Sequence, residues 1–117
     1  MIKRHYQIPK FETIYLNKKK NKFCLIIPVI NEGKNIQNLL NRIYQISLSK
    51  KIDIIIVDGG SNDKSIIVKD LKLKSIRGLI VLREEGKLSS QLRCAYSLAL
   101  KDGYRGFITI DGNNNYR

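Results

Sequence analysis

The sequence has one histidine, two cysteines and only short apolar runs. His5 is the only histidine and lies far from the polar motifs described below, so no acid–base pair can be assembled around it, and we interpret it as an incidental surface residue. Cys24 and Cys94 lack the spacing of a metal site or a redox motif. They fall in segments typical of a buried strand and a helix, which favours core packing for both.

No segment has the ~20 consecutive apolar residues that a membrane-spanning helix requires. The N-terminal residues 1–6, MIKRHY, do not develop into the apolar stretch and cleavage site of a secretory signal. We therefore expect a cytoplasmic protein that reaches a membrane surface only through charge. A chain of 117 residues has material for one modest domain and no second one.

Acidic residues are scarce, and the net charge is +12. Residues 1–22 hold seven of the 22 basic residues and one of the ten acidic ones, so half of the imbalance falls in this segment. We interpret residues 1–22 as a basic, solvated N-terminal arm and residues 23–117 as the folded part. Lys18, Lys19, Lys20 and Lys22 favour peripheral contact with an anionic membrane as the alternative role of the arm.

Four apolar runs typical of strands recur, at residues 23–30, 52–57, 78–82 and 107–110. Their starts are 29, 26 and 29 residues apart, the spacing of a βαβ unit, and they are continuously apolar, as in strands covered on both faces. Helical periodicity predicts helices over residues 34–47 and 88–99, with Gly103 as a stop, and a less regular one over residues 64–73 capped by Ser61. The pattern predicts an α/β fold, βαβαβαβ, with a mainly parallel sheet.

Polar residues follow three of the four strand runs. The first run ends in Asn31 and Glu32, the second in Asp58 and Gly59, and the fourth in Asp111, followed by Gly112 and the asparagines 113–115. In open α/β sheets, ligands bind outside the carboxyl ends of the strands, where glycines and helix N-termini admit phosphate groups. Because Asp111 and Asn113 offer oxygen ligands two positions apart, we expect Mg²⁺ or Mn²⁺ bridging a diphosphate.

These motifs resemble those of family 2 glycosyltransferases. Residues 24–32, CLIIPVINE, are similar to that family's opening IIPxxNE motif, and residues 55–63, IIVDGGSND, to its VDDGSxD motif. Gly86, Lys87 and Arg93 resemble its glycine- and lysine-led helix, and residues 109–113, TIDGN, stand in place of its DxD motif. The order and spacing agree over residues 23–115, which implies a truncated, Rossmann-like GT-A domain that binds a nucleotide-diphosphate sugar.

The resemblance implies a role for each matching residue. Pro28, Asn31 and Glu32 line the base and ribose pocket, and Asp58, with Gly59 beside it, contacts the nucleoside. Lys87 and Arg93 lie near the donor, a UDP or GDP sugar. Asp111 binds the ribose or the metal, and Asn113 is the second metal ligand.

Two positions depart from the family pattern. Gly59 replaces the second acid of VDD, so a base contact made by that acid has to come from the backbone or from Asp58. Asn113 replaces the last acid of DxD, which weakens the metal site and shifts coordination toward Asn115. In the family the general base and the acceptor-binding loops follow DxD, so we expect this chain alone to bind nucleotide weakly and to transfer sugar poorly or not at all.

Two other interpretations stay open. One is a non-catalytic basic module that binds nucleic acid or an anionic membrane, although an acidic and amide-rich strand edge does not favour nucleic acid. Removal of residues 1–22 separates this module from the donor-binding domain, which predicts little change in nucleotide binding. The other is a different nucleotide-dependent α/β transferase, such as a nucleotidyltransferase. The acceptor and the sugar are not predicted by the sequence.

Overall fold

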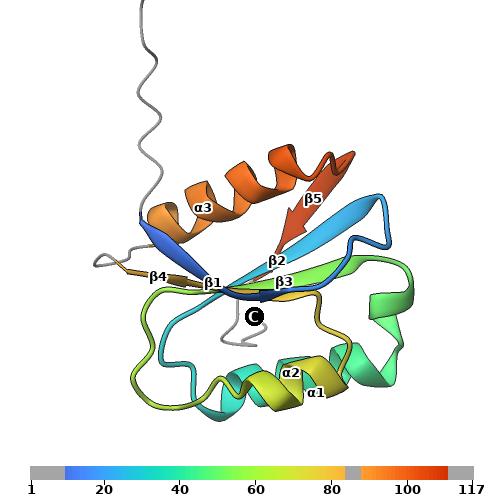
Figure 1. The fold of residues 1–117 in the computed structure, drawn as a ribbon. Coiled ribbons are helices and arrows are strands. Elements are labelled where there is room, and N and C mark those ends of the chain that lie inside the picture. Colours follow the sequence, from blue (N-terminus) through green and yellow to red (C-terminus); the bar gives the residue numbers. More distant parts are fainter. Residues whose placement is uncertain (1–9, 84–87, 111–117) are drawn as a thin grey trace, which may run out of the picture.

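The computed structural model describes residues 10–83 and 88–110. Pairing between strands gives one five-stranded sheet in the order β1-β4-β3-β2-β5 (Figure 1). All its neighbouring pairs are parallel except β1 with β4, which is antiparallel. The elements, in chain order, are β1 (Phe11–Leu16), β2 (Phe23–Val29), α1 (Lys34–Gln45), the short 3₁₀ helix η1 (Leu48–Lys50), β3 (Asp53–Asp58), α2 (Val68–Leu73), β4 (Gly78–Leu82), α3 (Leu88–Lys101) and β5 (Gly106–Thr109).

The sheet is covered on both faces, with α1 and α2 on one side and α3 on the other (Figure 1). Alternate residues of the central strands serve the two cores: Leu25 and Ile27 pack in the α1 core, and Cys24 and Ile26 in the α3 core. Strands buried on both sides need apolar residues at every position, which explains the continuous apolar runs. The predicted α/β class with a mainly parallel sheet is confirmed.

The predicted apolar face of the first helix is also confirmed. Ile36, Leu39, Leu40 and Ile43 are all buried against the sheet. The helix begins at Lys34 as predicted and ends at Gln45, because Ser47 has a positive φ of 56° that a right-handed helix cannot continue through.

The third helix ends as its sequence predicts. Gly103 has a φ of 73°, and the N–H of Tyr104 donates to the carbonyl of Ala99 at 3.1 Å. A glycine in the left-handed region with such a backbone bond is a common helix C-terminus. Cys94 is buried in this helix and Cys24 in β2, as expected for core residues. Burial raises the pKa of the Cys24 thiol to about 12.

The prediction of a solvated arm over residues 1–22 is wrong for residues 11–16, which form β1. Phe11 pairs with Leu82 and Leu16 with Gly78, and the hydroxyl of Tyr15 donates to the carbonyl of Ile76 at 2.7 Å. An edge strand is half exposed, so β1 lacks the continuous apolar run that marks the inner strands. The many lysines of residues 1–22 indicated a charged arm, so the sequence did not predict this strand.

The prediction of a helix over residues 64–73 is wrong at its start, since α2 begins only at Val68. Lys64 has a φ of 58°, which interrupts a right-handed helix. Ser61 therefore does not cap this helix. Asp63 accepts bonds from the N–H groups of Ser65 at 3.0 Å and Gly33 at 3.1 Å, and such local side-chain bonds compete with helix formation.

A buried charged network lies at the amino edge of the sheet, where the parallel strands begin. Asp53, 5% exposed, accepts hydrogen bonds from the hydroxyl of Tyr104 at 2.6 Å, from the amide of Asn21 at 2.8 Å and from the N–H of Lys20 at 3.1 Å. Burial by itself would raise the pKa of Asp53, but these bonds outweigh it and the pKa is lowered. Burial, followed by the bond to Asp53, raises the pKa of Tyr104.

A partly buried ion pair lies beside this network. Arg77, 9% exposed, donates to Asp102 at 2.6 Å and to the carbonyl of Asn17 at 3.0 Å. Its guanidinium lies 5.6 Å from the centre of the Tyr104 ring. The network thus ties β1, β3, β4 and the end of α3 together at one edge.

Candidate functional site at the carboxyl edge

The sheet order creates a switch point between β2 and β5. From β2 the chain proceeds to β3 and β4 on one side, and after α3 it returns to the other side of β2 as β5. In open α/β sheets the ligand crevice lies outside the carboxyl ends of the strands at this point. The residues that follow β2, β3 and β5 are therefore the candidates for the site.

The first two strand ends lie side by side. In the parallel register Val29 of β2 pairs with Asp58 of β3, and the N–H of Gly59 donates to the carbonyl of Val29 at 2.8 Å. The loops beyond are joined by the N–H of Asn31, which donates to Ser61 Oγ at 2.8 Å. In return, Asn31 Oδ1 accepts the N–H of Asn62 at 2.9 Å.

This geometry brings Asn31, Glu32, Asp58 and Gly59 to one edge, as the sequence predicts. Asn31 has a φ of 46°, a conformation that asparagine tolerates better than most residues. Glu32 is partly buried at the start of the turn, and its carbonyl accepts the N–H of Asn35 at 3.1 Å.

Asp58 has a structural role that the sequence did not predict. It is 6% exposed, and its Oδ1 accepts the N–H groups of Gly60 at 3.1 Å and Ser61 at 2.8 Å. These two bonds fix the path of the loop after β3. The same carboxylate that is expected to contact a nucleoside therefore also shapes the loop that surrounds it.

Asp63 strengthens the junction of the two loops. Its carboxylate accepts the N–H of Gly33 from the β2–α1 turn and the N–H of Ser65 from its own loop. Hydrogen bonds from Ser65 and Gly33 hold the pKa of Asp63 below its ordinary value. Asp63 is thus ionised near neutral pH, and its position favours a role in joining loops.

The structure reveals one site residue that sequence analysis missed, Gln91 of α3. Its side chain is 3% exposed, and Nε2 donates to the carbonyls of Val29 at 2.8 Å and Val57 at 3.0 Å. Gln91 thus bridges the ends of β2 and β3. Its spacing gave the signal, because position 91 is three residues after Leu88 and four before Ala95, on the apolar face of the helix.

Gln91 also explains why position 59 is a glycine. A Cβ built on Gly59 would lie 3.1 Å from both Cδ and Nε2 of Gln91. Since Gln91 is held by its two hydrogen bonds, it cannot move away freely. The acid that the family pattern places at this position is therefore replaced by a glycine with a glutamine packed against it.

The remaining predicted residues are less close to the junction or not described. Pro28 is buried within β2, opposite Val57. Arg93 is exposed on α3 and donates to Ser90 Oγ at 3.3 Å. Lys87, Asp111 and Asn113 lie outside the described residues, as does His5.

β5 lies along β2, and its last paired residue, Thr109, is opposite Ile26, three positions before Val29. The N–H of Ile110 donates to the carbonyl of Ile26 at 3.1 Å, so the chain leaves β5 next to β2. Among residues 10–83 and 88–110, no group of three or more His, Cys, Asp or Glu side chains could hold a metal ion. The predicted metal ligands Asp111 and Asn113 remain an expectation from the sequence.

Three comparisons with known proteins complete the description. The sequence profile described as "Glycosyl transferase family 2" matches residues 24–113. Searches of curated proteins and of solved structures each returned no match. In the part of the chain that the structure describes, every helix is too short or too polar to cross a bilayer.

Proposed function

Because the chain belongs to glycosyltransferase family 2, we propose that the carboxyl edge of its parallel sheet binds a nucleotide-diphosphate sugar for transfer to an acceptor. The observation that carries this proposal is the junction of the β2 and β3 ends. There a buried carboxylate and two glycines lie at the carboxyl ends of two parallel strands, next to the switch point between β2 and β5. This position in an open α/β sheet, with a carboxylate beside small residues, suits a nucleoside with attached phosphates.

Each oxygen of Asp58 has a separate task in this proposal. Both described bonds of the carboxylate end on Oδ1, so we assign Oδ2 to the nucleoside. The turn at Asn31 and Glu32 forms the neighbouring wall, and Arg93 on α3 supplies a positive charge on the side of the phosphates. Gln91 fills the space beside Gly59, so contacts to the base at this position come from the backbone.

The proposal includes a divalent cation, because the chain offers oxygen ligands for one. The carboxylate of Asp111 and the amide oxygen of Asn113 are hard ligands of the kind that Mg²⁺ and Mn²⁺ prefer. When bound, such a cation neutralises charge on the diphosphate leaving group. The residues of this chain do the remaining work, which is to orient the nucleoside and hold the two strand ends together.

Calorimetric titration of the chain with UDP and with GDP, with and without Mn²⁺, tests the proposal. We expect metal-dependent binding of at least one nucleotide. Asp58→Asn keeps the Oδ1 acceptor and removes the charge, and it should weaken binding about tenfold, as for loss of one hydrogen bond to a charged group. Asp70→Asn on α2 is the matched control, since it makes the same change in the ion pair with Lys74.

Absence of metal-dependent binding to either nucleotide would contradict the proposal. Equal affinity of Asp58→Asn and the unaltered chain would contradict the role given to Asp58 while leaving nucleotide binding intact.

A further inference from the structure

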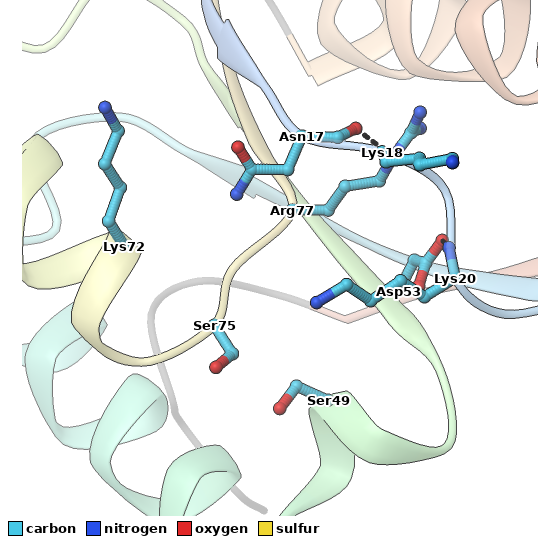
Figure 2. Close-up of a pocket in the computed structure, with 8 residues that line it drawn as sticks. All are labelled: Asn17, Lys18, Lys20, Ser49, Asp53, Lys72, Ser75 and Arg77. Carbon is cyan, nitrogen blue, oxygen red and sulfur yellow. Dashed lines mark hydrogen bonds between the residues drawn. The ribbon is translucent and has the colours of Figure 1, made fainter.

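A second candidate site lies at the opposite edge of the sheet. A cavity of about 160 Å³ is lined by the β1–β2 turn, η1, the first residue of β3, α2 and the α2–β4 connection (Figure 2). Asp53 borders this cavity and Asp58 borders the proposed nucleotide site, and the length of β3 separates them by about 16 Å. The two sites are therefore separate.

The size of the cavity limits what it can hold. Pockets for ligands of nucleotide size are typically about 300–1,000 Å³, and this one is about 160 Å³. Since a water molecule occupies roughly 30 Å³ of liquid, the space suits about five waters or one small tetrahedral anion.

The charge around the cavity is strongly positive. Lys18, Lys20 and Lys72 line it, and among the described residues none of the three forms an ion pair. The other two charged lining residues already have partners: Arg77 pairs with Asp102, and Asp53 accepts three hydrogen bonds. Three lysine charges are thus left without a described carboxylate partner at one small opening.

Neutral donors accompany these charges. Ser49 and Ser75 also line the cavity, one from η1 and one from the α2–β4 connection. Figure 2 shows the ammonium of Lys20 extending toward the side of the cavity where these two hydroxyls lie. The ammonium groups of Lys18 and Lys72 extend away from the two hydroxyls (Figure 2), and that of Lys72 lies 5.1 Å from the centre of the Tyr15 ring. Ammonium and hydroxyl donors from different elements around one cavity match the acceptor oxygens of a phosphate group.

We propose that this cavity binds a phosphate group, which comes either from a free phosphate ion or monoester or from the headgroup of an anionic lipid. A neutral ligand would leave the lysine charges uncompensated. The cavity is too small to enclose a whole nucleotide, so only the phosphate group of a larger ligand would fit inside it. The basic segment therefore contributes to a formed pocket, because β1 and the buried Asp53 network hold Lys18 and Lys20 in place.

Calorimetric titration of the chain with inorganic phosphate at low ionic strength tests the proposal. The double variant Lys20→Gln and Lys72→Gln should raise the Kd about tenfold or more, because it removes two charged donors. Both side chains are exposed, so the fold should persist. The matched control is the pair Lys51→Gln and Lys101→Gln, which removes the same charge from exposed lysines that do not line the cavity.

Vesicle flotation separates the two sources of phosphate. Binding to phosphatidic acid vesicles over phosphatidylcholine vesicles, lost in Lys20→Gln with Lys72→Gln and kept in the control pair, would identify a lipid headgroup. Binding of inorganic phosphate without vesicle binding would identify a soluble phosphate. Failure of the chain to bind either at millimolar phosphate, or an equal loss in the control pair, would overturn the proposal.

Discussion

The two edges of the same parallel sheet are stabilised in different ways. At the carboxyl edge, loops are joined mainly by side chains that bond to backbone N–H groups, as Asn31, Asp58 and Asp63 do. At the amino edge, side chains such as Asp53, Tyr104, Arg77 and Asp102 bond in a buried network. The first arrangement leaves loops that a ligand can contact. The second makes a rigid base that holds the strand beginnings and, with them, the register of the whole sheet.

We expect the largest loss of stability from a substitution at the amino edge. Asp102→Ala leaves the buried Arg77 guanidinium without its carboxylate, and loss of one partner of such a pair typically costs about 3 kcal/mol. We expect chemical denaturation to show this loss of unfolding free energy, while the folded variant keeps its nucleotide affinity. A drop in nucleotide affinity at full folding would mean that the two edges are coupled.

A smaller effect is expected where α3 reaches the carboxyl edge. Gln91→Leu keeps the size of the side chain but removes the donor that Gln91 supplies to the carbonyls of Val29 and Val57, at a cost of about 2 kcal/mol. The carbonyl of Val29 keeps the bond from the N–H of Gly59. Because Gln91 then no longer bridges the β2 and β3 ends, we expect nucleotide affinity to fall as well, unlike in Asp102→Ala. Denaturation and nucleotide titration of both variants, side by side, distinguish the two edges.

A comparison of alanine variants at Gly59 and Gly106 tests how tightly Gln91 is packed. Gly59→Ala should be destabilising, since its Cβ meets the fixed Gln91 side chain at 3.1 Å. Gly106→Ala meets only the Phe23 ring at 3.3 Å, and Phe23 is 48% exposed and free to shift. Equal stability of the two variants would contradict the tight packing of Gln91.

The smallest effect is a dependence of stability on pH. The pKa of Asp53 is lowered in the folded chain, so its stabilising contribution is present above the ordinary aspartate pKa of about 3.9 and is lost as the pH falls below it. Asp53→Asn should remove that acid limb and cost about 1 kcal/mol at neutral pH. Chemical denaturation of both proteins at several pH values between about 2 and 7 measures how the free energy of unfolding depends on pH. Asp70→Asn is the control.

The inner strands and α1 could be predicted from the sequence because burial on both faces forces a recognisable apolar run or period. The meeting of Asn31, Glu32, Asp58 and Gly59 followed from the same reasoning, since parallel strands end at one edge. The family match at residues 24–113 confirms that the motifs were recognised correctly.

The rest depends on contacts between residues that are distant in the sequence. Tyr104 and Asp53 are 51 positions apart, and Gln91 and Val29 are 62 apart, so no local pattern relates them. β1 was missed because an edge strand carries a weaker apolar signal than an inner one. The late start of α2 depends on a single backbone conformation, at Lys64, that residue type alone does not determine.

The position of β1 changes what shortening the chain would do. β1 pairs along β4, from Phe11 with Leu82 to Leu16 with Gly78. Deletion of residues 1–22 would remove a charged tail and also uncover the hydrogen-bonding groups of an apolar strand. Bare strands of this kind recruit other chains and promote aggregation. The N-terminal strand therefore protects solubility, and loss of polyanion binding after such a deletion would not by itself measure the charge that was removed.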